Sequence, residues 1–186
     1  MADLRIERTE KMLCGALLEL MCEKDFSAIT VGELCDRAMV RRATFYKHYA
    51  DKYDFLAFFV HRIRAELVTE LDGADPIDYC VGMFRGGIRF FESHMRLLRR
   101  AVDSPAYSVM TGILCSDAQN DLTERVREAW NVPEADAEIF ARFYVGGCFN
   151  LLRCWLTEPS NDDAEMVTQQ LRELLTRSRG AFLSSR

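Results

Sequence analysis

Hydrophobic side chains recur at intervals of three and four residues along almost the whole chain, and the alternation typical of half-buried strands is nearly absent. This spacing places the apolar side chains on one face of a helix. The first such stripe predicts a helix that ends near Glu23. Its inward-facing residues are expected to be Ile6, Leu13, Leu17 and Leu20. The pattern therefore predicts an all-α protein.

Two independent signals predict that a second helix starts at about Val31. Thr30 and Glu33 have the spacing of a capping box, in which the Thr hydroxyl accepts a hydrogen bond from the Glu amide. The Glu carboxylate in turn accepts one from the Thr amide. Ile29 and Leu34 stand at the positions of a hydrophobic staple around the same cap. Both signals give the same helix start.

A third helix is expected to begin at Arg41 or Arg42 and to run to about Tyr49. Phe45 and Tyr49 lie four residues apart on one face, where they can pack inward. The other faces suit the major groove of DNA, because Arg and Lys donate to guanine edges, Ala contacts a thymine methyl, and Thr, Tyr and His hold phosphates. The candidate DNA-binding residues are Thr30, Arg41, Arg42, Ala43, Thr44, Tyr46, Lys47, His48 and Lys52.

The alternative is that these basic residues form only the solvated face of a surface helix. Exposed Lys and Arg are common, so no single residue argues against that interpretation. The capping box, the helix length, the aromatic spacing and the basic face occur together, however. This combination favours DNA recognition.

The rest of the chain is also expected to be helical. Asp51 can cap a fourth helix, which runs to about Leu71 before the sequence DGADP breaks it. Pro76 begins a fifth helix, which leads into the basic run of residues 94–102. We interpret this run as a solvated face or an inter-helix turn, with DNA contact as the lesser alternative. Later helices are expected over residues 105–130 and 134–156 and after residue 163.

The segment over residues 30–52 resembles the DNA-binding end of the TetR family of transcriptional regulators. The match rests on Thr30, Ala38, Val40, Thr44, Phe45, Tyr46, His48, Tyr49 and Lys52. The sequence departs from the family pattern at the turn Gly, at a capping Ser or Thr, and at a Gly or Pro inside the helix. The residues at these positions are Met39, Arg41 and Ala43.

The resemblance implies a TetR-like fold with a three-helix, helix-turn-helix head over residues 1–50. A ligand-binding and dimerisation domain of five or six helices follows over residues 51–186. Residues 51–72 form the helix that links the two.

Gly146 and Gly147 interrupt an otherwise strong helical pattern, and each costs about 1 kcal/mol relative to Ala. Close approach of another helix would compensate for this cost. The surrounding sequence resembles the penultimate helix of TetR regulatory domains, which implies a four-helix dimer interface; a helix crossing within the chain is the competing interpretation. The candidate interface residues are Gly146, Gly147, Leu151, Trp155, Leu171, Leu174 and Leu175.

The resemblance also implies an effector pocket in the larger domain. A stripe of Met and aromatic residues is more often ordinary core, so that interpretation stays open. A pocket of this composition would take a small apolar or aromatic ligand. The candidate lining residues are Met83, Phe84, Ile88, Phe91, Tyr107, Met110 and Trp130.

Charge and cysteine content narrow the function classes. The net charge of −5 argues against indiscriminate coating of nucleic acid. The charge is unevenly distributed, however: residues 1–64 carry 11 Lys and Arg against 10 Asp and Glu, whereas the remainder carries 13 against 19. The seven cysteines are odd in number and form no C-x-x-C motif. We therefore expect no disulfide framework, no metal site and no cofactor, with a thiol-based sensor as a remaining alternative.

The chain has no run of about 18 apolar residues and no signal peptide, which predicts a cytoplasmic protein that does not enter a membrane. It also lacks G-x-S-x-G, H-E-x-x-H and P-loop motifs, so we do not expect an enzyme. The sequence favours a ligand-responsive repressor that binds a palindromic operator as a homodimer. The alternative is a TetR-like co-regulator or activator that acts through a protein partner with weak or no DNA binding.

Overall fold

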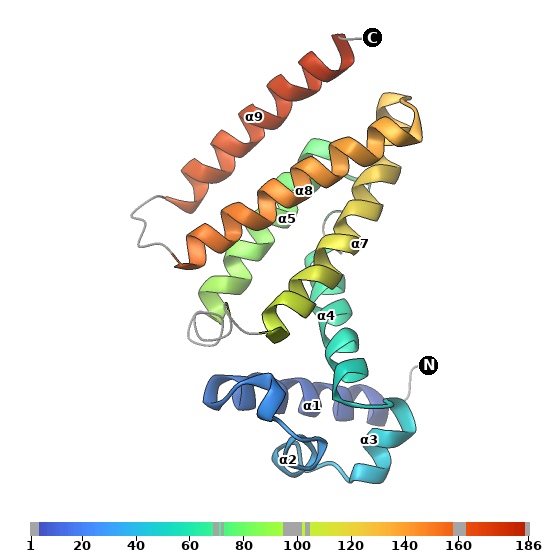
Figure 1. Cartoon of the computed structure of the whole chain (residues 1–186), viewed down its shortest axis with the longest axis vertical. Helices are drawn as coiled ribbons and strands as arrows, with labels where there is room; N and C mark the ends of the chain where they lie inside the picture. The colour runs from blue at the N-terminus through green and yellow to red at the C-terminus, as the bar shows by residue number, and fades with distance from the viewer. Residues whose placement is uncertain are drawn as a thin grey trace. The chain divides into compact units, whose positions relative to one another are not determined.

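The computed structural model describes residues 4–68, 71, 73–94, 102, 105–157 and 163–184, and every regular element in these residues is a helix (Figure 1). This confirms the predicted all-α class. The elements are α1 (Leu4–Glu23), the 3-10 helix η1 (Phe26–Ala28), α2 (Val31–Arg37), α3 (Arg42–His48), α4 (Lys52–Val68), α5 (Pro76–Ser93), α7 (Pro105–Trp130), α8 (Glu134–Thr157) and α9 (Ala164–Ser184). Most of the basic run predicted over residues 94–102 lies outside the described residues.

The chain folds into two compact units. The first comprises Met1–Ile63 and Arg96–Ile113, and the second comprises Arg64–Met95 and Leu114–Arg186. Helices α4 and α7 each contribute residues to both units. The expected division into a DNA-binding domain over residues 1–50 and a second domain over residues 51–186 stays a prediction.

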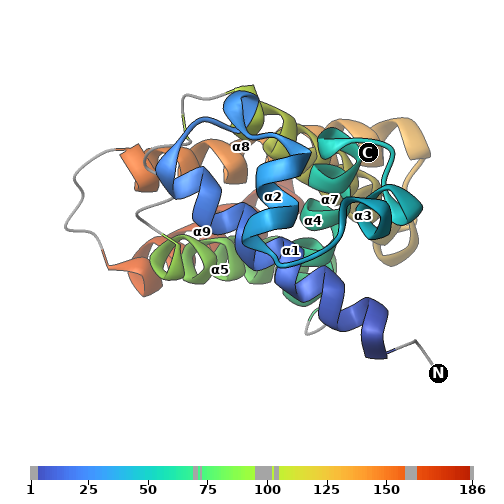
Figure 2. The same cartoon turned by 90° about the horizontal axis from the view of Figure 1, so that it is seen from below.

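The buried face of α1 begins at Leu13 and includes Leu17 and Leu20, as the apolar stripe predicts. The expectation for Ile6 was wrong, because its side chain is 39% exposed. Ile6 lies two turns before Leu13, near the start of α1, and Figure 2 shows this N-terminal end of the helix extending beyond α2 and α3.

An aromatic cluster packs α3 against the start of α4. Phe45 and Phe55 are fully buried, and their ring centroids lie 5.7 Å apart. Tyr49 is also buried and contacts both rings, at 5.3 Å from Phe45 and 4.9 Å from Phe55. The predicted inward pair Phe45 and Tyr49 is confirmed, and it fixes which face of α3 points outward.

Helix α5 is the central element of the second unit and packs on α8 and α9. The Asp75 carboxylate caps it by accepting from the amides of Ile77 and Asp78 at 2.8 and 2.9 Å. Gly87 permits close packing on α8, because a Cβ there would lie 2.8 Å from Cδ1 of Leu152. A close helix approach at a glycine thus occurs at Gly87 within this unit, whereas the approach expected at Gly146 and Gly147 stays a prediction.

A polar cluster joins α4, α5 and α7 inside the second unit. The Arg64 guanidinium forms an ion pair with Asp121, and the Tyr79 hydroxyl donates to the same carboxylate at 3.0 Å. The Arg125 guanidinium stacks 4.7 Å from the centre of the Tyr79 ring. Burial and the neighbouring Asp121 raise the pKa of Tyr79, which therefore stays protonated as a donor.

Candidate nucleic-acid interface

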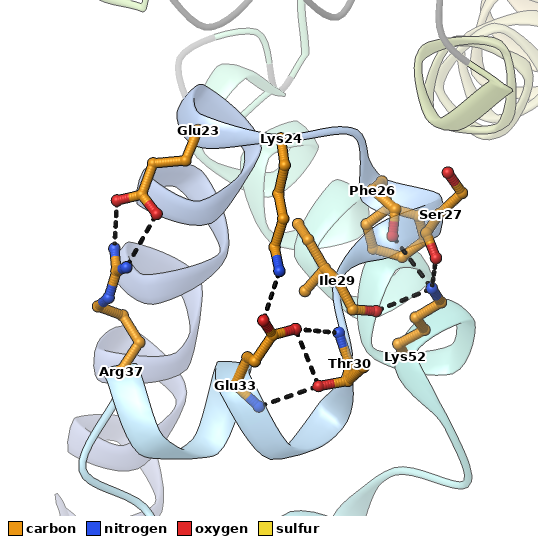
Figure 3. A network of polar contacts seen from close by, with 9 residues as sticks. All are labelled: Glu23, Lys24, Phe26, Ser27, Ile29, Thr30, Glu33, Arg37 and Lys52. Carbon is orange, nitrogen blue, oxygen red and sulfur yellow. Dashed lines mark hydrogen bonds and ion pairs between the residues drawn. The ribbon is translucent and has the colours of Figure 1, made fainter.

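The predicted capping box is present at the start of α2 (Figure 3). The Thr30 hydroxyl accepts from the Glu33 amide at 3.2 Å, and the Glu33 carboxylate accepts from the Thr30 amide at 3.0 Å. Lys24 adds an ion pair to Glu33 at 2.5 Å. The hydrogen bond from Lys24, followed by those from the Thr30 amide and hydroxyl, lowers the pKa of Glu33 to about 2. The predicted staple residues Ile29 and Leu34 are both fully buried.

Arg37 fastens the other end of α2 to α1. Its Nη1 and Nη2 donate to the two carboxylate oxygens of Glu23 at 2.9 and 3.0 Å (Figure 3). Nη1 also donates to Glu19 at 3.3 Å. The hydrogen bond from Arg37 lowers the pKa of Glu23. Because both ends of this short helix are held, α2 provides a fixed support for α3.

The turn between α2 and α3 keeps the conformation for which the family uses glycine. Met39 has a φ of 54°, in the left-handed region, and its side chain is 84% exposed. The amide of Val40 donates to the carbonyl of Cys35 at 2.9 Å and closes the end of α2. Because its side chain points into solvent and meets no steric clash, the left-handed conformation of Met39 lowers the stability of the fold only by its backbone cost of about 1–2 kcal/mol. The departure at Met39 therefore leaves the turn intact.

Helix α3 presents most of its predicted DNA-binding residues to solvent. Arg41 precedes its first turn in an extended conformation and makes no side-chain cap, as expected for a residue without an acceptor. Thr44 is half-buried. The exposed residues are Arg41, Arg42, Ala43, Tyr46, Lys47 and His48. Six of the candidate residues are thus exposed on α3 or directly before it.

Lys52 has a different environment from the other candidates (Figure 3). Its ammonium donates to the carbonyl oxygens of Phe26, Ser27 and Ile29 at 3.0, 2.7 and 2.8 Å. It also lies 5.0 Å from the centre of the Phe26 ring and 5.5 Å from that of Tyr53. An ammonium has three donors, and all three are used within the head. This geometry assigns Lys52 to joining α4 to the segment before α2.

Sequence reasoning missed three residues of the head, namely Lys24, Arg37 and Gly32, over which the Arg42 side chain lies. The first two form ion pairs with residues 9 and 14 positions away, a separation that helical periodicity does not reveal. Gly32 offered a signal, because a glycine inside a short helix is unfavourable and calls for a packing explanation.

The predicted pocket residues are distributed over both units. Tyr107 and Met110 belong to the first unit, whereas the other five belong to the second. Phe84 and Ile88 are fully buried, and Met83 is half-buried. Trp130 packs against Phe140, with ring centroids 4.7 Å apart. The lining of a pocket by these seven residues stays a prediction.

The second unit exposes an apolar stripe along α8, which we call the α8 stripe. It comprises Ile139, Phe143, Gly146, Gly147 and Leu151. Ile139 is 66% and Phe143 73% exposed, and a Cβ at either glycine would meet nothing within 4 Å. The competing interpretation of an intrachain helix crossing at the glycine pair is therefore wrong for the described residues.

The other predicted interface residues differ in exposure. Leu174 on α9 is exposed, and Trp155 is half-buried. Leu171 and Leu175 are buried within the subunit, on the face of α9 that packs on α5. These two leucines have no surface to offer a partner.

Two features of the described residues bear on other classes of function. Their His, Cys, Asp and Glu side chains form no group of three that could hold a metal ion. None of their helices combines the length and apolar content that crossing a membrane requires.

The chain matches two family models. Residues 15–57 match the bacterial regulatory proteins of the tetR family, and residues 90–177 match a transcriptional regulator C-terminal region. Over 70 residues, which are 37% of the chain, it is 39% identical to the uncharacterized HTH-type transcriptional regulator YxbF of Bacillus subtilis (strain 168). This match spans only 18% of the length of that curated relative.

Solved structures show the same fold. A TetR transcriptional regulator from Streptococcus agalactiae 2603V is similar with a TM-score of 0.64 at 22% identity, over 92% of this chain and 96% of that one. The fatty acid degradation regulator FadR from Bacillus halodurans gives 0.65 at 14% identity, over 89% and 96%. These likenesses show the fold, and the two family models, which together match residues 15–57 and 90–177, identify the chain as a member of the TetR family of transcriptional regulators.

Proposed function

We propose that this regulator is a repressor that binds a palindromic DNA operator as a homodimer in the cytoplasm and releases it when a small apolar or aromatic effector binds. The observation that carries the proposal is the outward surface of α3, which a doubly held α2 and an intact turn support. The role is one of binding rather than of catalysis, in keeping with the family.

In this proposal α3 lies in the major groove. Arg42 and Lys47 donate to guanine edges, and Ala43 contacts a thymine methyl. Tyr46 and His48 contact phosphates. Arg41, Thr44 and Thr30 add further phosphate contacts, whereas Lys52 acts by holding the head together.

The α8 stripe supports the homodimer. Exposed side chains as large as Phe143 and Ile139 beside two open glycines form an apolar surface that a second copy of α8 can approach closely. With Leu174 of α9 they provide the four-helix contact that the family resemblance implies. A two-fold dimer would place two heads on successive major grooves, about 34 Å apart.

The effector would act by favouring the form of the dimer whose heads do not match this spacing. A ligand shifts such an equilibrium only through its different affinities for the two forms. The buried apolar side chains of α5, among them Phe84, Ile88 and Phe91, are the proposed lining, and they suit an apolar or aromatic ligand.

A gel-shift experiment with the DNA upstream of the protein's own transcription unit tests the proposal. We expect a specific complex whose affinity falls steeply with salt, because phosphate contacts release counterions. Arg42→Ala and Lys47→Ala should relax the sequence preference, whereas Arg177→Ala, which removes an exposed charge on α9 outside the head, should not. The absence of any specific complex would favour the alternative co-regulator that acts through a protein partner.

A further inference from the structure

Gly32 is the second residue of α2, and neither the backbone nor the cap of that helix requires a glycine there. The capping box uses the side chains of Thr30 and Glu33 only. The φ of Gly32 lies outside the left-handed region, so an L-residue is compatible with the backbone. Alanine would favour the helical state at this position about five-fold over glycine. The glycine therefore calls for an explanation outside its own helix.

The space over Gly32 is filled by the side chain of Arg42. A Cβ at position 32 would lie 2.9 Å from Cζ and 3.3 Å from Nε of Arg42, and closer still to Nη2. A Cβ almost never lies as close to another heavy atom as 2.9 Å, and 3.3 Å is tighter than most Cβ contacts, so the guanidinium occupies the place of the missing side chain. Arg42 is the first residue of α3, so its side chain lies over the bare Cα of Gly32 in α2 at the point where α3 begins.

The Arg42 guanidinium rests on Gly32 by packing alone. Arg42 is exposed, and within the described part of the chain no acceptor takes a hydrogen bond from it and no carboxylate pairs with it. Arg37 on the same supporting helix shows the contrast, because Glu23 engages both of its terminal nitrogens. A guanidinium that is positioned but keeps its donors free is arranged to bind a planar pair of acceptors, such as O6 and N7 of guanine.

We propose that Gly32 is a positioning residue that determines specificity, because it holds the Arg42 guanidinium in the orientation that reads a guanine in the operator. This inference rests on the proposed DNA-binding function. Restricting a long side chain before binding avoids an entropy loss that is equivalent to about two- to ten-fold in affinity. A side chain at position 32 displaces the guanidinium, which ends a flexible chain, and leaves the backbone in place.

Gly32→Ala tests the inference, with Gly15→Ala as the matched control. Gly15 is an exposed helical glycine of α1 in the same unit, and a Cβ there meets nothing within 4 Å. Both variants gain the same helix propensity, so both should unfold thermally at or above the wild-type temperature. Affinity is measured on the sequence that wild type selects from a randomised DNA pool, and on versions changed at the base pair where Arg42→Ala loses its preference.

We expect Gly15→Ala to bind like wild type. Gly32→Ala should lose about ten-fold in affinity for the selected sequence and its preference at that one base pair, as befits the loss of one well-placed bidentate contact. In an Arg42→Ala background, Gly32→Ala should change nothing further, because the side chain that it displaces is already absent.

Two results would overturn the inference and leave the DNA-binding function standing. One is a Gly32→Ala protein with the wild-type preference. The other is an equal further loss in the Arg42→Ala background, which would show that the added methyl obstructs DNA without involving Arg42. A wild-type protein that selects no sequence at all would refute the proposed function and the inference together.

Discussion

Replacing Lys52 by Met is expected to destabilise the first unit by about 2–4 kcal/mol. The substitution removes an ammonium that donates to three carbonyl oxygens at 2.7–3.0 Å and keeps most of the apolar stem. Hydrogen bonds to charged groups contribute about 1.5–3 kcal/mol each. The expected loss is smaller than three times the lower value, because the Ser27 carbonyl is exposed and a water molecule can replace the ammonium there. The two ring contacts add about 0.5 kcal/mol.

Urea denaturation followed by circular dichroism measures this loss. Lys47→Met is the matched control, since Lys47 is an exposed lysine of α3, and its replacement should change the free energy of unfolding by less than about 0.5 kcal/mol. A Lys52→Met protein as stable as this control would refute the reasoning.

A DNA measurement separates the two roles of Lys52. A lysine that neutralises a phosphate contributes about 0.9 to the slope of log affinity against log salt concentration. We expect Lys52→Met to leave this slope unchanged, because the ammonium is already engaged within the head. A decrease of about one unit in the magnitude of this salt slope would instead show that Lys52 contacts a phosphate.

Three further predictions address other parts of the chain. Phe143→Glu should convert the proposed homodimer to monomers in analytical ultracentrifugation, while Ser116→Glu, at an exposed position of α7, should not; two dimeric variants would exclude the α8 stripe as the interface. Because its pKa is lowered from 4.5 to about 2 in the folded chain, Glu33 stabilises the head fully above pH 4.5 and loses this contribution as the pH falls toward 2. Glu33→Gln should therefore make the urea midpoint of unfolding depend less on pH at acidic pH. An unchanged dependence would show that the Glu33 carboxylate is not the source of this stability. Met39→Gly should raise the free energy of unfolding by about 1 kcal/mol by relieving the left-handed φ, and a lower melting temperature would count against that strain.

The parts of the fold that the sequence predicted well are those set by short separations. The capping box of Thr30 and Glu33 spans three residues, and the inward pair Phe45 and Tyr49 spans four, so helical geometry alone relates the partners. The same periodicity gave the orientation of α3 and with it the outward surface of the head.

Contacts between distant residues were not predictable in this way. Lys52 binds carbonyl oxygens 23 to 26 positions earlier, and Arg64 pairs with a carboxylate 57 positions later. An apolar stripe also does not say which neighbour will cover it. Leu175 packs inside its own subunit while the adjacent Leu174 faces solvent, although both fit one helical pattern.

Helix α4 has a mechanical consequence that follows from its composition. Its 17 residues include neither glycine nor proline, so it forms a stiff rod about 25 Å long. Swinging such a lever by about 10° displaces its far end by about 4 Å, which exceeds the 3.4 Å rise of one base pair. A tilt of about 10° at one end of this helix thus moves the other end by more than the step from one base pair of DNA to the next.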